Sequence, residues 1–129
     1  MAAALVRRTA AGAVEVLIAQ RPPGSWQAGH WEFPGGKVEA GEAGEAALHR
    51  ELREELGIAV LQAVPVDVFR HSYPDRMVEI ALWLVPGFAG EPRGLDGQAL
   101  RWVSPGTLPQ CDLLEADLPM IAPLLSALE

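Results

Sequence analysis

The sequence predicts an α/β fold in which a β-sheet is sandwiched between helices. Short apolar runs typical of strands alternate along the chain with two stretches of helical periodicity. Half of the 129 residues are hydrophobic, which excludes a disordered chain, and no repeat or linker divides the sequence. A chain of this length buries roughly two thirds of its unfolded surface in a single core. We therefore expect one domain over residues 1–129.

The first third of the chain is predicted to begin with a β-hairpin. Residues 3–8 and 13–20 have the composition of strands, and Gly12 between them is suited to a turn. Residues 21–25 contain two prolines, which fix φ and remove N–H donors, so this segment is predicted to be a loop. Residues 31–33 follow as a short extended piece, before a sharp turn made by one proline and two glycines.

A helix from about Gly44 to Leu56 is expected next. Leu48, Leu52 and Leu56 recur every four residues and form an apolar stripe that can pack against a sheet. Gly57 is well placed to end the helix, because glycine readily adopts the left-handed conformation that is common just after a helix.

The second half of the chain is predicted to contain three strands. Residues 58–70 and 77–85 form two of them, separated by a turn at residues 72–75. Residues 86–97 are rich in glycine and proline and are expected to form a loop, and the third strand covers residues 100–103.

A final helix is predicted near the C-terminus, and Pro123 inside it is expected to produce a kink. Its apolar residues recur at a period near 3.6: Leu118, Ile121, Leu125 and Leu128. The single Cys111 is interpreted as a small core residue, and the four tryptophans as mostly core.

Bulk composition limits the classes of function. A net charge of −7 argues against binding of a nucleic-acid polymer, since the phosphate backbone requires a basic surface. One cysteine cannot form an internal disulfide, which is typical of a reducing compartment. Arg7 and Arg8 interrupt the N-terminal apolar run, and no apolar stretch is long enough to span a bilayer. We expect a cytoplasmic protein without a membrane partner.

Three carboxylates share one face of the predicted helix. At about 100° per residue, Glu54 and Glu55 lie roughly 60° and 40° to either side of Glu51. Like charges at this spacing repel unless a cation neutralises them. Hard oxygen ligands suit Mg²⁺ or Mn²⁺, although a solvated helix face would have the same composition.

The spacing around these carboxylates is more informative than the carboxylates alone. Gly36 is followed after five residues by Glu42, and after seven more by Arg50-Glu51. The pattern is completed by an aliphatic residue, any residue, Glu54-Glu55, any residue, Gly57 and a final aliphatic residue. The chain resembles the Nudix hydrolase family at every fixed position of its signature. The resemblance implies an α/β/α sandwich with a mixed sheet, and an enzyme that hydrolyses nucleoside diphosphates linked to another group.

The same resemblance implies roles for individual residues. It places Glu51, Glu54 and Glu55 as ligands of Mg²⁺, with Mn²⁺ as the alternative metal and the Gly35 carbonyl as a further ligand. Asp96, in a loop well after the signature, corresponds to an acidic residue with a metal-linked or general-base role; an exposed turn aspartate is the competing explanation.

Three neighbouring residues are predicted to support this site. Glu42 can orient the signature loop, and Arg50 can bridge carboxylates and hold Glu51 in one rotamer, unless it is a simple surface arginine. Lys37 directly follows the glycines and can meet a phosphate as a point charge.

Resemblance outside the signature points to the MutT-like subfamily, which converts 8-oxo-dGTP to the monophosphate and pyrophosphate. By this resemblance, Arg21, Phe33 and Arg76 lie near the nucleotide, and Phe33 contributes an apolar wall for the base. The segments that carry the likeness are residues 17–21, 31–37, 73–76, 90–92 and 116–119.

Asp117 departs from the MutT pattern, which has asparagine at the matching position. An ionised aspartate accepts hydrogen bonds only, from a guanine edge or from cytosine N4–H₂. A related branch of CTP and modified-cytidine triphosphate pyrophosphohydrolases also ends in an Ala-Asp-x-Pro segment. Purine and pyrimidine substrates both remain open, and Asp117 can alternatively be the N-cap of the last helix.

Two further alternatives are a Nudix hydrolase of another nucleoside diphosphate derivative and a catalytically dead Nudix domain that senses a ligand. The dead-domain alternative is disfavoured because Glu51, Glu54 and Glu55 are all present. The expected partner is a nucleoside triphosphate, bound by a monomer or a homodimer.

Overall fold

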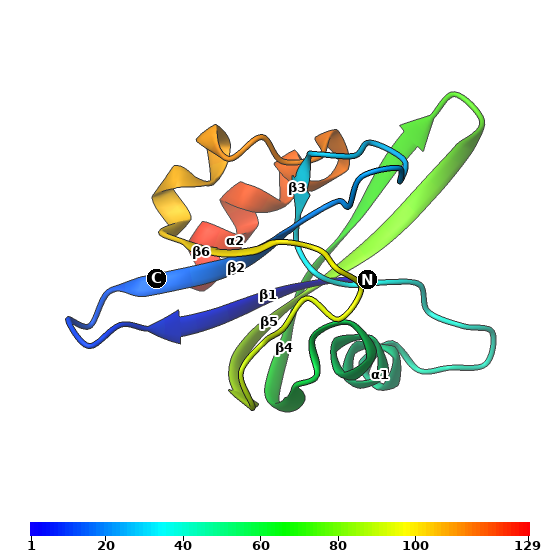
Figure 1. Cartoon of the computed structure of the whole chain (residues 1–129). Coiled ribbons are helices and arrows are strands. Elements are labelled where there is room, and N and C mark those ends of the chain that lie inside the picture. Colours follow the sequence, from blue (N-terminus) through cyan, green and yellow to red (C-terminus); the bar gives the residue numbers. More distant parts are fainter.

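The computed structural model describes all 129 residues and contains a six-stranded mixed sheet with helices on both sides (Figure 1). The strands are β1 (Ala2–Arg8), β2 (Val14–Gln20), β3 (Trp31–Glu32), β4 (Ala59–Tyr73), β5 (Arg76–Ala89) and β6 (Leu100–Val103). The helices are α1 (Gly44–Leu56), two 3₁₀ helices, η1 (Pro105–Gln110) and η2 (Glu115–Met120), and α2 (Ile121–Ala127). The predicted fold class is confirmed.

β1 connects the two parts of the sheet. Its first half, Ala2–Leu5, pairs in parallel with Leu82–Val85 of β5, and its second half pairs antiparallel with β2. β2 also pairs with β3 and β6, while β4 and β5 form a long antiparallel hairpin at the other side. The opening hairpin that the sequence predicted is therefore present, with Gly12 at φ 85° in its turn.

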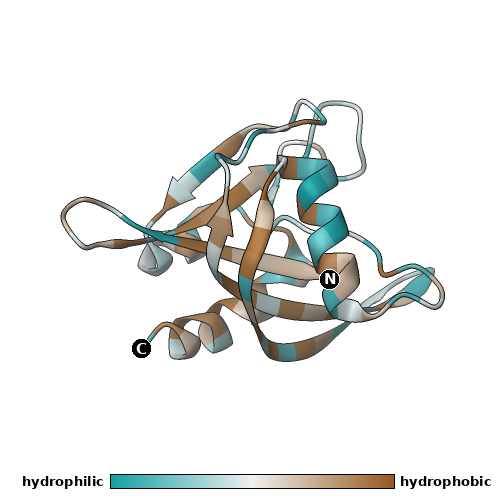
Figure 2. Ribbon diagram, turned by 90° about the horizontal axis from the view of Figure 1, so that it is seen from below, coloured by the Kyte–Doolittle hydropathy of each residue, from teal (hydrophilic) through white to brown (hydrophobic).

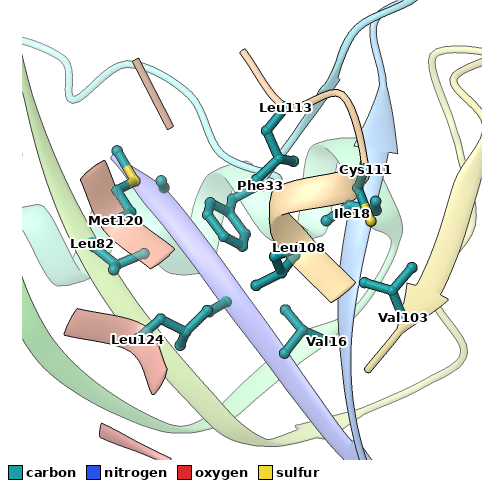
Figure 3. Packing of buried hydrophobic residues seen from close by; sticks show 12 residues of the cluster. Val16, Ile18, Phe33, Leu82, Val103, Leu108, Cys111, Leu113, Met120 and Leu124 are labelled. Atoms are coloured by element: carbon teal, nitrogen blue, oxygen red, sulfur yellow. The ribbon is translucent and has the colours of Figure 1, made fainter. Parts of the chain in front are cut away.

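Two hydrophobic cores fill the space between the sheet and the helices. On one side, the leucine stripe of α1 is fully buried against Leu5, Leu17 and Val85 of the sheet. On the other side, η1, η2 and α2 cover a core that includes Phe33 and Cys111 (Figure 3). Because the leucines of α1 face the sheet, the opposite, polar side of this helix is exposed. Figure 2 shows hydrophilic turns on α1.

The β4–β5 hairpin is longer than the sequence predicted. β5 continues to Ala89, so the loop expected from residue 86 begins only at Gly90. The register with β4 shifts between Val60 and Gln62 and again before Val64. Such bulges leave residues out of the ladder, so Pro86, which has no N–H donor, does not end the strand.

The C-terminal helix differs from its prediction. The chain forms the 3₁₀ helix η2 and then a short α2, and the fully buried positions are Met120 and Leu124, while Leu118 is 45% exposed. Pro123 lies in the first turn of α2, where a helix leaves its N–H groups unpaired, so it removes no helical hydrogen bond and the predicted kink was wrong. None of the helices has the length and apolar character needed to cross a bilayer.

Candidate active site

A cleft of about 1220 Å³ opens beside the Gly35-Gly36 turn, between the loop after β2 and the tip of the β4–β5 hairpin. The structure brings seven of the predicted site residues to its walls: Arg21, Phe33, Gly35, Lys37, Glu55, Arg76 and Asp117. A smaller pocket of about 180 Å³ shares Arg21, Gly35 and Glu55 with the cleft and adds Asp96.

The glycine turn approaches α1 so closely that a side chain at Gly36 would collide with the Glu51 carboxylate. A side chain at Gly35 would collide with the backbone of Met1. The turn is fixed by the Gly36 N–H, which donates to the Met1 carbonyl (3.1 Å), and by the Met1 ammonium, which donates to the Gly36 carbonyl (2.6 Å). Both glycines are therefore required for close approach.

Arg50 holds together the outer part of the signature. Its Nε and Nη2 donate to the two carboxylate oxygens of Glu42 at 2.8 and 2.9 Å. Its Nη1 donates to Glu51 (2.9 Å) and to Glu54 (3.3 Å), and Nη2 also donates to the Lys37 carbonyl (3.0 Å). The contacts predicted for Arg50 are present.

The charge of Arg50 changes the pKa of the carboxylate that it binds most closely. Hydrogen bonds from Arg50, followed by that from the Glu39 N–H, lower the pKa of Glu42 to about 2. Hydrogen bonds to Glu42 and then to Glu51 raise the pKa of Arg50 in return, so its guanidinium stays charged. The network therefore fixes Glu51 and Glu54 from one side.

Glu55 has a different environment from the carboxylates that contact Arg50. It lines both cavities beside Gly35, whose backbone partly opposes the rise in the pKa of Glu55. Burial, and next the charge of Glu51, raise the pKa of Glu55 to about 7. A partly buried carboxyl beside a second carboxylate, with no cationic side chain bonded to it, is a location where a bound cation would be stabilising.

The three glutamates do not form a complete metal site by themselves. No group of three or more carboxylate, imidazole or thiol side chains converges closely enough to hold an ion. Mg²⁺, however, is commonly held by one or two carboxylates together with water and substrate phosphates. Glu55, with Glu51 as its charged neighbour and the glycine turn beside it, fits this incomplete donor set.

The loop after β5 brings Asp96 to the smaller pocket. The Leu95 N–H donates to the Glu55 carbonyl (3.1 Å), and Gln98 Nε2 donates to the same carbonyl (3.3 Å). The Gln98 side-chain oxygen in turn accepts from the Asp96 N–H (2.9 Å). These bonds fix the loop on the C-terminal end of α1 and place Asp96 in the same pocket as Glu55. Gln98 was not predicted as a site residue.

Asp117 is the one charged side chain in the buried core, at 5% exposure. Its Oδ2 accepts a hydrogen bond from the Phe33 N–H at 2.9 Å. The capping alternative was wrong, because Asp117 lies inside η2, and the N-cap positions of η2 and α2 are Leu114 and Met120. Burial raises its pKa to about 7, so near neutral pH a protonated form can also donate a hydrogen bond.

Phe33 borders the cleft but is only 2% exposed. Its ring packs among core residues, as Figure 3 shows, and its main contribution at the cleft is the backbone N–H that orients Asp117. The ring therefore contributes little surface to the cleft, in contrast to the apolar wall for a base that was predicted for Phe33. Phe33 directly follows Glu32, the last residue of β3, and in extended chain successive side chains point to opposite sides.

Arg21 is held by two contacts in the loop between β2 and β3. Its Nη1 donates to the Glu32 carboxylate (3.1 Å) and its Nε to the Trp26 carbonyl (2.6 Å). Glu32 lines both cavities, and burial raises its pKa although Arg21 opposes the shift. Sequence reasoning missed Glu32, Trp26 and Tyr73 as cleft residues. The available signal for Glu32 was its position directly before Phe33, which was predicted to lie near the nucleotide.

Comparisons with known proteins agree with this geometry. A family model described as NUDIX domain matches residues 2–122. The chain is 44% identical over 107 residues to a CTP pyrophosphohydrolase of Escherichia coli, covering 83% of this chain and 79% of the relative. It is 39% identical over 110 residues to an 8-oxo-dGTP diphosphatase of the same organism, covering 85% of each. A solved MutT structure, from work on Aliivibrio salmonicida and Vibrio cholerae, superposes with a TM-score of 0.78 at 34% identity, covering 97% of this chain and 95% of that one.

Proposed function

The chain belongs to the Nudix hydrolase family, and on that premise we propose that it is a MutT-type nucleoside triphosphate pyrophosphohydrolase. Its proposed substrate is 8-oxo-dGTP, which it would convert to the monophosphate and pyrophosphate and so remove from the nucleotide pool. The observation that carries the proposal is a single cleft lined both by Glu55, a carboxylate suited to a metal–phosphate complex, and by Asp117, a buried carboxyl suited to a base edge.

Nudix hydrolases generally use divalent metal ions, and we propose Mg²⁺ here, with Mn²⁺ as a substitute. The proposed ligands are Glu51, Glu54, Glu55 and the Gly35 carbonyl, and Asp96 is proposed as a further ligand or as the general base. When bound, the metal neutralises phosphate charge and lowers the pKa of a water molecule.

The side chains at the acidic end of the cleft would then position the phosphates. Arg50 keeps the Glu51 and Glu54 carboxylates in place through its hydrogen bonds. Lys37 and Arg21 line the cleft and would supply positive charge to the phosphate oxygens. Asp96 is the carboxylate that we propose to accept the proton of the attacking water, because it lies in the pocket beside Glu55.

At the other end of the cleft, Asp117 would read the base, with Arg76 nearby. The Phe33 N–H occupies one carboxylate oxygen, so the Asp117 side chain has a fixed orientation and retains hydrogen-bonding capacity for a ligand. A guanine edge offers N1–H and N2–H donors to the ionised form. The protonated form can also donate, as the amide found at this position in MutT does.

A second candidate is hydrolysis of CTP or a modified dCTP. It is favoured by the carboxyl group of Asp117, which can accept from cytosine N4–H₂, and by the similarity to a CTP pyrophosphohydrolase. We propose in either case that residues 1–129 act as a single domain, as a monomer or a homodimer. The cytoplasm, which contains the free nucleotide pool, is the proposed location.

The test is pyrophosphate release in Mg²⁺, with kcat/KM compared for 8-oxo-dGTP, dGTP, CTP, dCTP and a 5-substituted dCTP. We expect monophosphate and pyrophosphate as the only products and a strong preference for 8-oxo-dGTP over dGTP. A preference for the cytidine nucleotides would select the second candidate. No release from any of the five would overturn both.

A further inference from the structure

Two segments that are far apart in the sequence meet at the mouth of the cleft. These are the loop between β2 and β3, which carries Trp26, and the tip of the β4–β5 hairpin, which carries Tyr73 and Arg76 (Figure 1). The Trp26 and Tyr73 rings lie 5.2 Å apart, edge to face at 79°. The Arg76 guanidinium lies 5.8 Å from the centre of the Trp26 ring and 5.5 Å from that of Tyr73. No backbone hydrogen bond joins the two segments, so the contact depends on side chains.

Trp26 is fixed in this position although its ring is half exposed. Its carbonyl accepts from Arg21 Nε (2.6 Å), and Arg21 is itself held by Glu32. The loop is closed by Gly29, whose N–H donates to the Arg21 carbonyl (3.1 Å) and whose carbonyl accepts from Gln20 Nε2 (3.0 Å). Trp26 is therefore held in a defined loop with 49% of its surface exposed, and it presents an aromatic ring at the wall of the cleft.

The position of Trp26 relative to Asp117 suggests what that partner is. Both residues line the same cleft, and Tyr73, which touches Trp26, lies close enough to Asp117 to be affected by its charge. A carboxyl that binds the edge of a base leaves the flat face of the base uncovered. Phe33 does not cover it, since the Phe33 ring is buried in the core.

We propose that Trp26 is the surface on which the nucleobase stacks, supported by Tyr73, while Asp117 binds the edge of the base. This inference rests on the proposed function. Stacking is tolerant of base identity because every base has a π face, but a purine covers more of an indole ring than a pyrimidine does. Trp26 is therefore a specificity-determining residue that favours the larger base.

Binding of nucleoside monophosphates to metal-free protein tests the proposal by calorimetry. Trp26→Ala should weaken the affinity for 8-oxo-dGMP about tenfold and that for CMP less. Ribose 5-phosphate, which lacks a base, should bind the variant as it binds the original protein. Trp26→Phe should retain most of the affinity. Met77→Ala removes an exposed apolar side chain near the tip of the β4–β5 hairpin that does not line the cleft, and it should change nothing.

A second variant separates stacking from loop packing. Trp26→Leu keeps an apolar side chain but has no flat ring, so stacking requires it to resemble Trp26→Ala. If Trp26→Leu binds 8-oxo-dGMP normally, or if Trp26→Ala weakens ribose 5-phosphate equally, the proposal is overturned.

The triphosphate assay distinguishes this inference from the proposed function. With Mg²⁺, Trp26→Ala should raise KM for 8-oxo-dGTP about tenfold while kcat stays within about twofold. Unchanged KM in a variant of an active enzyme would refute the role of Trp26 alone. Absence of turnover in the original protein would instead refute the proposed function.

Discussion

Two carboxylates in and beside the cleft are in opposite electrostatic states. Glu42, which lies beside the acidic end and does not line the cleft, is bonded to Arg50, which lowers its pKa to about 2. At the base end, Asp117 is buried with one backbone N–H as its donor, and its pKa is raised to about 7. The comparison shows that a guanidinium keeps Glu42 charged at neutral pH, whereas burial raises the pKa of Asp117, and also that of Glu55 at the acidic end, to about 7.

The acidic end should respond most strongly to loss of one carboxylate. Glu54→Gln is expected to lower kcat by roughly 100- to 1000-fold, because it removes a proposed metal ligand. The fold should persist, since the Glu54 side chain is 60% exposed. Glu45→Gln, equally exposed on the same helix, is the matched control and should be neutral. Near-normal turnover of Glu54→Gln in a pyrophosphate assay would show that the metal assignment is wrong.

Stability against pH should separate Asp117 from Glu42 by sign. Asp117 holds its proton to a higher pH in the folded than in the unfolded protein, so its contribution to the free energy of unfolding falls as pH rises from about 4 to about 7. Glu42 acts in the opposite direction: its contribution is present above about 4.5 and is lost as pH falls towards 2.

Urea unfolding of metal-free protein between pH 3 and 8 measures both contributions. Asp117→Asn should flatten the decline between pH 4 and 7 by roughly 3 kcal/mol, leaving the part that comes from Glu55, whose pKa is raised in the same direction. Glu42→Gln should flatten the acid side only. If Asp117→Asn has the same slope as the original protein, Asp117 is already ionised in the fold and the contrast with Glu42 is lost.

Arg50 is expected to act through the carboxylates that it touches. Arg50→Lys keeps the charge but cannot bond both oxygens of Glu42 while reaching Glu51, so kcat should fall by about 10- to 100-fold with little change in KM. Arg53→Lys, on the exposed side of α1, provides the comparison. A change confined to thermal stability would limit Arg50 to a structural role.

The base end should control which nucleotide is used. Asp117→Asn replaces a titrating carboxyl by an amide that always donates and accepts, and it is expected to raise the ratio of kcat/KM for 8-oxo-dGTP over CTP by about tenfold. Turnover of the preferred substrate should stay well above that of Glu54→Gln. The same ratio in both proteins would remove Asp117 from base recognition.

The acidic end could be predicted from the sequence because it is encoded locally. Helical periodicity places Glu51, Glu54 and Glu55 together, and the spacing from Gly36 to Glu42 to Arg50 anticipates the contacts that the structure shows. Both bounds of α1 and the left-handed Gly57 follow from the same local signals.

The base end could not be predicted in the same way, because its contacts join distant residues. The Phe33 N–H and Asp117 are 84 residues apart, and whether Asp117 caps a helix or reads a base depends on where η2 begins. Trp26 and Tyr73 meet because the loop after β2 lies against the tip of the β4–β5 hairpin, which is far away in the sequence. Tryptophan composition favoured a core position, and nothing local indicated that Trp26 is exposed.

The smallest expected effect concerns the end of α1, which supports the acidic side without touching substrate. Gly57 has φ 69°, so Gly57→Ala should lower the free energy of unfolding by about 1 kcal/mol and leave kcat unchanged. Gly44→Ala, at the start of the same helix with room for a methyl group, should be neutral or slightly stabilising. A kcat change in Gly57→Ala alone would show that this helix end is coupled to the site.

A crystal structure with Mg²⁺ and a hydrolysis-resistant 8-oxo-dGTP analogue tests the central claim most directly. We predict the triphosphate and metal beside Glu51, Glu55 and the glycine turn, with the base edge on Asp117. A nucleotide bound in the reverse direction, or a base that does not contact Asp117, would contradict the assignment of the two ends.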